Sequence, residues 1–516
     1  MRCNQALSEI IVSASLHSIV RYCSCAAFAS RRATDHASRA GRFQASSRAL
    51  AAALFCTFLL GACIDVSMPA YKRPDTPEKT SWSDKRVSVI SAADTIDPEW
   101  WKSFHDPHLD TLIAKAIGGN FDIKVLAARI DVAKAQIGEA QAGALPTADL
   151  GAGANFQQVT GSGAGSGFTK QYNLAGQVSW DIDIWGKVEK GVQAQKAEFH
   201  ATEADWRAAY LELVANVSTA YFQILQFDDQ IEQQQKTLAT NRQILAIYEG
   251  QSRNGLIPQT QVVRQQAEIN RLTNELLDLH RSRDLANNAL STLIGVPAGE
   301  FTLPSGHLEQ RVQLPPVPAG LPSQLLARRP DIVAAEFRVL EAYNLVGEAK
   351  LAQLPTINLT GHAGTASFAL TDLLKSFTYG LMPSINFPLF DPSVRAHIGT
   401  TKAQNTVAEQ QYRSTVMGAF EEVENALVNL NSHRQQRIEL LQEVARLQLV
   451  ADQIEAQLRA GVVSQLEVFE TERTLLTAQQ DLLTNHQQIL SDTVVLYKAL
   501  GGGWPPVDVQ LEVKEH

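Results

Sequence analysis

The sequence predicts a mainly α-helical chain with a smaller membrane β-barrel portion, built from two copies of one structural unit. Three observations lead to this prediction. Short stretches recur at a nearly constant separation, proline is absent from two very long segments, and strands of alternating polarity lie between helical segments. Each repeat is expected to contribute two strands and one long helical hairpin.

The N-terminal part resembles an export signal that ends at Cys63. An apolar run of about 12 residues follows Arg42 and Arg48, which is the length of a signal-peptide core and too short to span a bilayer. It ends in LGAC, which resembles the lipobox of bacterial lipoproteins, whose cysteine is acylated. We expect residues 1–62, an upstream extension and signal peptide, to be removed. Cys63 is expected to carry the lipid, such as palmitate, and no other cofactor is expected.

Composition excludes several classes of function. The formal net charge is −9 and no basic block is present, which argues against nucleic acid as a partner. All five cysteines lie at or before Cys63, so the body has neither a disulfide framework nor a cysteine-based zinc site. No HExxH, GxSxG, CxxC or P-loop motif occurs, and the chain is therefore not expected to be an enzyme.

The two copies are visible in aligned stretches. GEAQAGALPTADL begins at Gly138, and GEAKLAQLPTINL begins at Gly347. NGLI at Asn254 corresponds in the same way to AGVV at Ala460. The expected organisation is a lipidated N-terminal segment at 63–108, a first repeat at 109–295, a Pro-rich linker at 296–322, a second repeat at 323–503 and a C-terminal tail at 504–516.

The strands alternate between apolar and polar residues. Val178, Trp180 and Ile182 point one way, whereas Ser179 and Asp181 point the other. This alternation over about 10 residues is typical of a transmembrane barrel, and equally of any half-buried strand. The strands are expected at about 147–158 and 172–184 in the first repeat, and at about 356–367 and 378–390 in the second.

The helical segments are unusually long. At 1.5 Å per residue, the proline-free segment from Gly186 to Gly250 would be roughly 95 Å long. Apolar residues at steps of three and four, as in 416–430, are typical of coiled-coil seams. Gly255 and Gly461 break the helices and permit a tight reversal. The hairpins are expected at 187–294 and 393–500.

Three side-chain groups are expected to serve packing or solvation rather than binding. Trp100, Trp101 and Phe104 should anchor the N-terminal segment against the helices. The glutamine run 233–235 should be a solvated helix face. His105 and His108 lack a third ligand nearby, so no metal site is expected there.

Four strands per chain cannot close a barrel, and an open sheet edge in lipid leaves backbone groups unsatisfied. Eight strands would fill their own lumen with side chains, whereas twelve strands from three chains leave room for a pore. The sequence therefore favours a homotrimer. The alternative is a lipoprotein coiled-coil spacer or periplasmic adaptor without a pore. An adaptor should carry its hairpin once between β-rich segments, and this chain carries it twice.

Four further stretches resemble the TolC-like outer-membrane factors, specifically the OprM/NodT lipoprotein branch. They are PAYKRP at 69–74, EWWKSFHDPHLDTLIAKAI at 99–117, NFDIKVLAARIDVAKAQIGEAQAGALP at 120–146 and ARRPDIVAAE at 327–336. The resemblance runs from Cys63 to about Gly502. Together the four motifs are specific to this family.

This resemblance implies a trimeric 12-stranded β-barrel joined to a 12-helix α-barrel, in the bacterial outer membrane with a long periplasmic portion. It implies a passive exit duct of a tripartite efflux system for multidrug or toxic compounds. The implied partners are two sister chains, a periplasmic membrane-fusion adaptor, an inner-membrane pump and outer-membrane lipid.

The family's helix-reversal glycines correspond to Gly255 and Gly461. The resemblance implies that these glycines, with Leu256 and Val462, form the periplasmic tip where the adaptor docks. The tip is also where the closed duct of this family narrows.

Family members often carry acidic residues six and nine positions after the second glycine, where they form the pore constriction. Those positions are Glu467 and Glu470 here, although the family usually has aspartate. The two share a helix face. The equivalent residues of the first copy are Gln261 and Arg264. Two other interpretations remain open: a solvated helix face, or a pairing of Glu470 with Arg473.

Overall fold

The computed structural model describes residues 66–77, 79, 81–83, 97–159, 167–315, 327–502 and 504. The expected signal segment, Cys63, most of the loop at 160–167, part of the linker and nearly all of the C-terminal tail lie outside these residues. The chain divides into two units, 1–67 and 68–516, and the description below concerns the second unit. No helix among the described residues is both long enough and apolar enough to cross a membrane.

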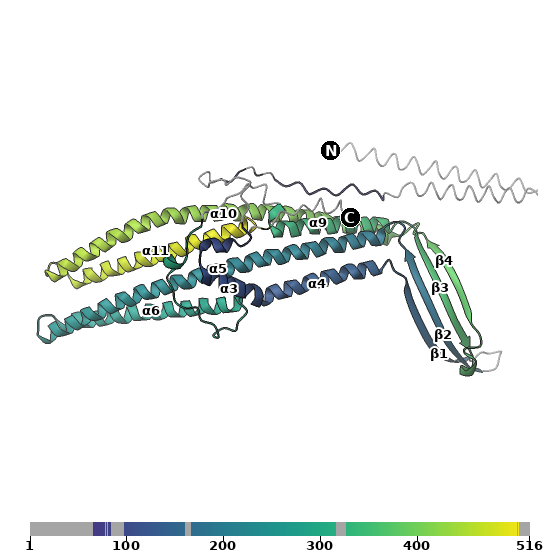
Figure 1. Ribbon diagram of the computed structural model, residues 1–516, viewed down its shortest axis with the longest axis horizontal. Helices are drawn as coiled ribbons and strands as arrows, with labels where there is room; N and C mark the ends of the chain where they lie inside the picture. The colour runs from purple at the N-terminus through teal and green to yellow at the C-terminus, as the bar shows by residue number, and fades with distance from the viewer. Residues whose placement is uncertain are drawn as a thin grey trace, which may run out of the picture. The chain divides into compact units, whose positions relative to one another are not determined.

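The same order of elements occurs in both halves of this unit (Figure 1). A helix leads into two strands, which are followed by a helix of 67 or 68 residues, a reversal and a helix of 35 residues. The first half holds η1 (Trp100–Phe104), α3 (Pro107–Gly119), α4 (Phe121–Ala142), β1 (Thr147–Val159), β2 (Gly167–Ile182), α5 (Lys187–Arg253) and α6 (Gln259–Leu293). The second half holds α7 (Leu308–Arg311), α9 (Pro330–Leu351), β3 (Thr356–Ser367), η2 (Leu370–Asp372), β4 (Thr378–Asn386), α10 (Pro392–Arg459) and α11 (Gln465–Ala499).

The four strands form one antiparallel sheet in the order β1-β2-β3-β4. The two halves of the chain meet in its centre, where β2 pairs with β3 and Trp180 lies opposite Leu359. β1 and β4 each pair with one neighbour and have a second edge without a strand among the described residues. The sheet of a single chain is therefore open on both sides.

Both boundaries of β2 differ from the expectation of 172–184. β2 begins at Gly167 rather than 172, because its ladder with β1 continues to the pair Val159 and Gly167. It ends at Ile182 rather than 184, because the Asp183 carboxylate accepts hydrogen bonds from the backbone N–H groups of Lys187 (2.7 Å) and Glu189 (3.1 Å) at the start of α5.

The fourth strand is shorter than expected. β4 ends at Asn386 rather than 390, because its last partner is Thr356, the first residue of β3. Pro355 directly precedes Thr356 and has no backbone N–H to extend the ladder. Phe390, which the alternation placed in the strand, instead lies in the connection to α10 and is 78% exposed.

Large apolar side chains of the sheet face outward in the single chain. Leu150 of β1 is 79% exposed, and Tyr379 and Leu381 of β4 are 83% and 68% exposed. A patch of this kind on a water-exposed surface marks an interaction with lipid or another chain. The sheet thus presents both open edges and an apolar surface.

The long helices pack through small residues. Ala197, Ala201 and Ala204 form a stripe on α5 that lies against Val333 and Phe337 of α9. Alanine at steps of three and four lets two helix backbones approach closely. At 1.5 Å per residue, α5 and α10 are each about 100 Å long.

An aromatic cluster fixes the N-terminal segment to the helices, as the sequence predicted. The Trp100 ring stacks on Tyr497 of α11 with ring centroids 5.2 Å apart and planes 8° apart. Phe104 packs against Phe222 of α5 at 5.2 Å, and Trp101 is buried beside it. Each such aromatic pair adds about 0.5–1.5 kcal/mol to the free energy gained from burial.

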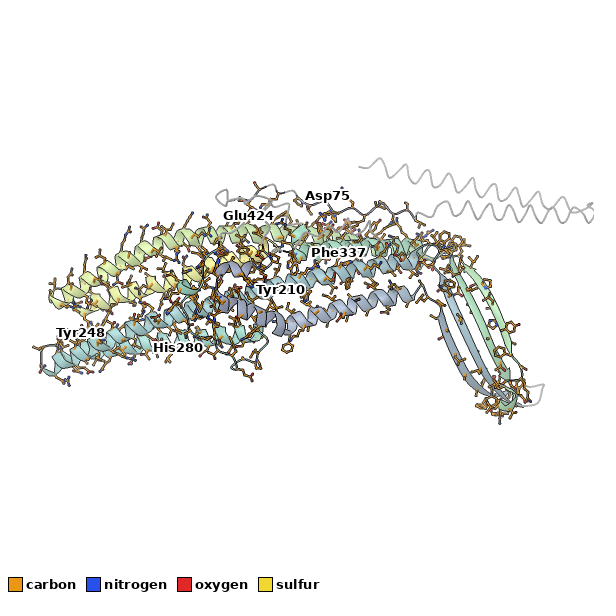
Figure 2. The ribbon with its side chains drawn as sticks, in the orientation of Figure 1. Asp75, Tyr210, Tyr248, His280, Phe337 and Glu424 are labelled. Carbon is orange, nitrogen blue, oxygen red and sulfur yellow. The ribbon has the colours of Figure 1, made fainter. Side chains whose placement is uncertain are left out.

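The described part of 68–83, called the strap below, crosses α9 and α10. The Arg73 guanidinium donates a 2.7 Å hydrogen bond from Nε to the Glu336 carboxylate, whose side chain is 1% exposed. Burial and the neighbouring Glu336 carboxylate raise the pKa of the Tyr71 hydroxyl, which stays protonated. Figure 2 shows Asp75 of the strap and Glu424 of α10, and Glu424 pairs with Lys79 at 2.7 Å.

The ion pair between Arg73 and Glu336 joins two of the four motifs that carry the family resemblance. Arg73 belongs to PAYKRP, and Glu336 is the last residue of ARRPDIVAAE. A second arginine of that motif, Arg329, is also buried and reaches Asp331 at 2.6 Å and Glu422 of α10 at 2.8 Å. Charged residues of these two motifs therefore make specific contacts between segments far apart in sequence.

The interface between α5 and α9 contains a carboxyl pair. Burial raises the pKa of Glu341 to about 7, and Glu198 of α5 adds to this rise through its charge and a hydrogen bond, while Arg338 opposes it. The folded state holds the proton of the Glu341 carboxyl more tightly than the unfolded chain does. The stability that this protonated carboxyl contributes is therefore complete below the pKa of Glu341 in the unfolded chain. That contribution is lost as the pH rises through about 7.

We therefore expect Glu341→Gln to flatten the dependence of thermal stability on pH. From pH 5 to pH 8 the unfolding temperature of the wild type should fall by about 2 °C or more beyond any fall in the variant. Differential scanning calorimetry of both proteins over this range measures the effect. The matched control is Glu443→Gln, which alters an exposed carboxylate of α10. Equal slopes for wild type and Glu341→Gln would contradict the assignment.

Candidate functional site at the hairpin tips

The first hairpin reverses at Gly255. Its φ of 73° lies in the left-handed region, where a side chain is strained. The backbone N–H of Gly255 donates to the Ser252 carbonyl at 3.0 Å, and that of Leu256 donates to the Gln251 carbonyl at 2.9 Å. These two bonds are the Schellman pattern that ends a helix. The reversal leaves the Leu256 side chain 73% exposed.

The second hairpin reverses in the same way at Gly461. Its φ is 72°, its N–H donates to Leu458 at 2.9 Å, and the N–H of Val462 donates to Gln457 at 3.0 Å. Val462 is also 73% exposed. Each hairpin thus ends in one exposed aliphatic side chain that directly follows a left-handed glycine.

We expect alanine at either tip glycine to loosen the reversal. A Cβ at Gly255 or Gly461 would meet no atom within 4 Å, so any cost comes from the left-handed backbone alone, about 1–2 kcal/mol. The amides of Leu256 and Val462 should then exchange their hydrogens about tenfold faster, as measured by hydrogen–deuterium exchange. The control is Gly250→Ala, which is equally open but lies within α5. Unchanged exchange in both tip variants would contradict this account.

Glu467 and Glu470 lie in the first turns of α11. Gln465 and Val468, on the opposite face of this helix, are 7% and 5% exposed. Both glutamates are exposed in the single chain and point away from that buried face. Their carboxylates therefore project from the wall of the hairpin pair rather than into it.

Neither glutamate side chain has a hydrogen bond or ion pair within the described part of the chain. In particular, no ion pair joins Glu470 to Arg473 among these residues. The corresponding positions of the first hairpin are the half-buried Gln261 and the exposed Arg264. The acidic pair thus occurs in the second hairpin only.

Buried amide side chains join the two hairpins behind the tips. Gln265 of α6 is fully buried and donates hydrogen bonds to the backbone and side-chain oxygens of Asn241, at 3.0 and 2.9 Å. Gln465 of α11 donates to Gln265 at 2.8 Å. Since a buried amide without partners is costly, these bonds fix how α11 sits on α5 and α6.

The expectation that the glutamine run 233–235 is solvated was wrong for two of its residues. Gln234 is fully buried and donates to the Leu272 carbonyl at 3.0 Å, and Gln233 donates to Gln479 of α11 at 2.6 Å. The sequence does carry a signal for this burial, which is the helical spacing of the amide residues. Gln230, Gln234 and Asn241 lie in register with the buried Leu238, so they continue the apolar seam with amides.

One carboxylate takes part in this amide network. Glu472 of α11 receives a 3.4 Å hydrogen bond from the Asn241 side chain. Burial raises the pKa of Glu472, and the hydrogen bond from Asn241 partly offsets that rise. The half-buried Glu472 carboxylate is thus contacted by an amide from the other hairpin.

Comparison with known proteins shows which family has this architecture. The family profile described as outer membrane efflux protein matches residues 112–296 and 321–502. These segments include both hairpins and all four strands.

The chain belongs to the outer membrane efflux protein family.

Several relatives are similar along nearly their whole length. Cation efflux system protein CusC of Escherichia coli O6:H1 is 28% identical over 465 residues, covering 86% of this chain and 98% of CusC. Pyoverdine export outer membrane protein OpmQ of Pseudomonas putida is 29% identical over 455 residues, covering 86% of this chain and 96% of OpmQ. The solved outer-membrane channel OprN superposes with a TM-score of 0.76 at 25% identity, covering 86% of this chain and all of OprN.

This outer membrane efflux protein is therefore the outer-membrane exit duct of an efflux system. Its relatives include a probable outer membrane lipoprotein, SilC of Salmonella typhimurium, at 28% identity. The family is one of ducts and not of enzymes. Both tip glycines and the acidic pair lie inside the matched segments, whereas the strap and Cys63 precede them.

Proposed function

We propose that three copies of this chain close their sheets into a 12-stranded β-barrel, continuous with a 12-helix tube built from the paired hairpins. Substances leave the cell through this duct without chemical change. The observation that carries the proposal is the open sheet, whose outer strands β1 and β4 each have one edge without a partner strand among the described residues. In a membrane these edges require partners, because lipid offers no hydrogen bonds.

The number of chains follows from the size of the sheet. One chain supplies four strands, and two chains would make an eight-stranded barrel filled by its own side chains. Three chains are the smallest ring that leaves a pore. The exposed Leu150, Tyr379 and Leu381 then supply the apolar surface that faces lipid.

The hairpins suit the wall of a tube. Each chain provides two hairpins with long arms of 67 and 68 residues, whose exposed faces a neighbouring chain would cover. In the proposed trimer the tips at Gly255 and Gly461 lie at the periplasmic end. There Leu256 and Val462 would contact a membrane-fusion adaptor, which in turn binds an inner-membrane pump. Lipid on Cys63 would anchor the chain to the outer membrane.

The acidic pair would narrow this end. Three chains would bring three copies of Glu467 and Glu470 around one axis. Like charges brought together repel, so a cation at the constriction would favour closure. Exposure of both side chains in the single chain supports this role, as does the lack of an ion-pair partner for either within the described residues.

The duct is expected to be permissive for cargo. CusC is named for cations and OpmQ for pyoverdine, yet both resemble this chain to the same degree, at 28% and 29% identity. We propose that the pump selects the exported compound, within the multidrug and toxic compound class, and that the duct passes it on.

The decisive experiment is the mass and conductance of the detergent-extracted protein. Native mass spectrometry should give a trimer, and planar bilayers should show discrete channels. A trimer without conductance would favour the spacer or adaptor alternative, and a monomer would end the proposal. Labelling with palmitate should be lost in Cys63→Ser while the trimer persists, which tests the anchor separately.

A further inference from the structure

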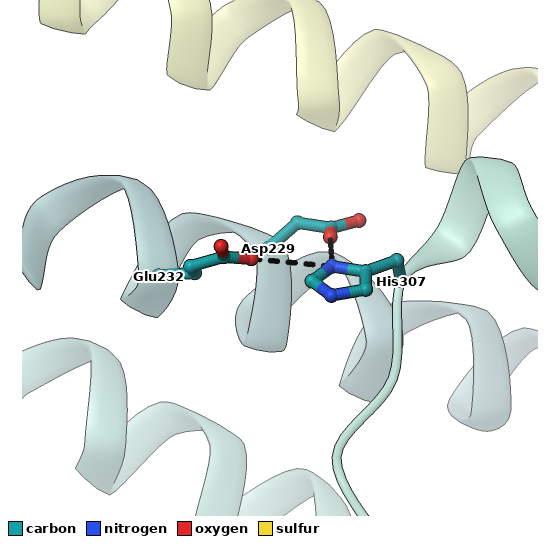
Figure 3. A group of neighbouring side chains, drawn as sticks. All are labelled: Asp229, Glu232 and His307. Atoms are coloured by element: carbon teal, nitrogen blue, oxygen red, sulfur yellow. Dashed lines mark hydrogen bonds and ion pairs between the residues drawn. The ribbon is translucent and has the colours of Figure 1, made fainter. Parts of the chain in front are cut away.

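A second cluster of charged side chains lies far from the tips, where residues 294–307 between α6 and α7, called the connector below, contact α5. Asp229 and Glu232 of α5 and His307 of the connector bring three ligand-type atoms within 4.8 Å of one another (Figure 3). The two carboxylates are three residues apart and so share a helix face. His307 immediately precedes α7 and approaches that face from the connector.

Both carboxylates converge on the same ring nitrogen. His307 Nδ1 lies 2.8 Å from Asp229 Oδ1 and 3.3 Å from Glu232 Oε2. One N–H can donate well to only one of these oxygens, so the ring cannot satisfy both Asp229 Oδ1 and Glu232 Oε2 at once. Two carboxylates and one imidazole facing each other are instead the donor set that a divalent transition metal prefers.

The distances suit a shared ion. Zinc bonds to nitrogen and carboxylate oxygen are about 2.0–2.2 Å long, which places neighbouring ligand atoms about 3.0–3.5 Å apart in tetrahedral or octahedral geometry. The separations at His307 Nδ1 fall close to this range. A proton on Nε2 would leave the Nδ1 lone pair free for the ion.

The second oxygen of each carboxylate contacts a group outside the cluster. Asp229 Oδ2 accepts a 3.0 Å hydrogen bond from the backbone N–H of Leu308, and Glu232 Oε1 pairs with Lys236 at 2.7 Å. Such outer contacts orient metal ligands in established sites. The neighbouring Asp228 is not available as a ligand, because its oxygens contact Arg283 at 2.6 Å and the N–H of Gly306 at 3.2 Å.

The site is also open to an incoming ion. The Asp229 side chain is 12% exposed, whereas those of His307 and Glu232 are 44% and 42% exposed. Glu232 and His307 line a cavity of about 710 Å³ that also reaches His280 of α6. Water in this cavity can complete the coordination shell.

We propose that Asp229, Glu232 and His307 bind one divalent transition-metal ion of the Zn²⁺ type, which fastens the connector between the two halves to α5. All three ligands come from a single chain, so the site does not depend on the proposed trimer. An ion there links α5 of the first hairpin to the segment that leads into the second half.

The test uses full-length lipidated protein, extracted in detergent, purified without a histidine tag and stripped of metal with a chelator. Zn²⁺ is titrated in competition with a chromophoric chelator. We expect one Zn²⁺ per chain with micromolar affinity, and at least tenfold weaker binding in His307→Ala and in Glu232→Gln. Zn²⁺ should raise the unfolding temperature of the wild type and leave that of His307→Ala unchanged.

The matched control is His280→Ala. This substitution removes a histidine that lines the same cavity but does not belong to the cluster (His280 is labelled in Figure 2). Its affinity for Zn²⁺ should stay within twofold of the wild type. Co²⁺ in place of Zn²⁺ should show no thiolate charge-transfer band, which excludes Cys63 as the ligand. Absence of binding up to millimolar Zn²⁺, or equal binding by His307→Ala, would overturn the proposed site.

Discussion

Replacing both Glu467 and Glu470 with glutamine is expected to reduce the preference of the duct for cations over anions about tenfold. In the proposed trimer the pair forms a ring of carboxylates at the narrowest point. Rings of acidic side chains attract cations and exclude anions at short range. The measurement is the reversal potential of single channels in a salt gradient, which should move toward zero in the double variant.

The first hairpin offers the matched control. Arg264 occupies the position equivalent to Glu470, and Arg264→Gln changes a charge at the same distance from its tip glycine. This variant should leave the cation preference in place. If the double glutamate variant keeps the wild-type reversal potential, the pair is a solvated helix face and the constriction lies elsewhere.

Replacing Arg73 with methionine is expected to lower the free energy of unfolding by about 3–5 kcal/mol. The substitution keeps most of the volume of the side chain but leaves the Glu336 carboxylate, 1% exposed, without the guanidinium that contacts it at 2.7 Å. A buried charge that loses its partner is among the most destabilising single changes. Chemical denaturation of the detergent-extracted protein, followed by tryptophan fluorescence, measures the loss.

The adjacent residue provides the control. Lys72 pairs with Asp75 at 3.2 Å on the surface, with side chains 77% and 86% exposed, so Lys72→Met should cost less than about 0.5 kcal/mol. The double variant Arg73→Met with Glu336→Gln should regain much of the lost stability, because it removes the charge itself. A cost for Arg73→Met no larger than that of Lys72→Met would show that the buried pair does not stabilise the strap.

The periodic parts of this chain were predictable from the sequence. The glycine reversals at Gly255 and Gly461, the long hairpins and the two strands per half all follow from local rules. Such rules act between residues close in sequence, such as a left-handed glycine that ends a helix or a side-chain alternation of period two. The ends of the strands were predicted less accurately. β4 ends where its pairing with β3 ends, and β2 ends where the Asp183 carboxylate caps the start of α5.

The contacts between distant segments could not be read from one sequence. Gln234 was expected in water because glutamine is usually solvated, yet α6 covers it and supplies a carbonyl acceptor. The pairing of Arg73 with Glu336 likewise joins residues in separate motifs, each of which was visible only as a family signature.

The sequence by itself determined the repeated plan, the helix ends and the family, because each depends on local periodicity and short motifs. The tertiary structure decided which polar groups are buried together: the Arg73–Glu336 pair, the amides behind the tips, and the convergence of Asp229 and Glu232 on His307. The physical reason is that desolvation depends on what covers a side chain. That covering comes from segments that only folding brings together.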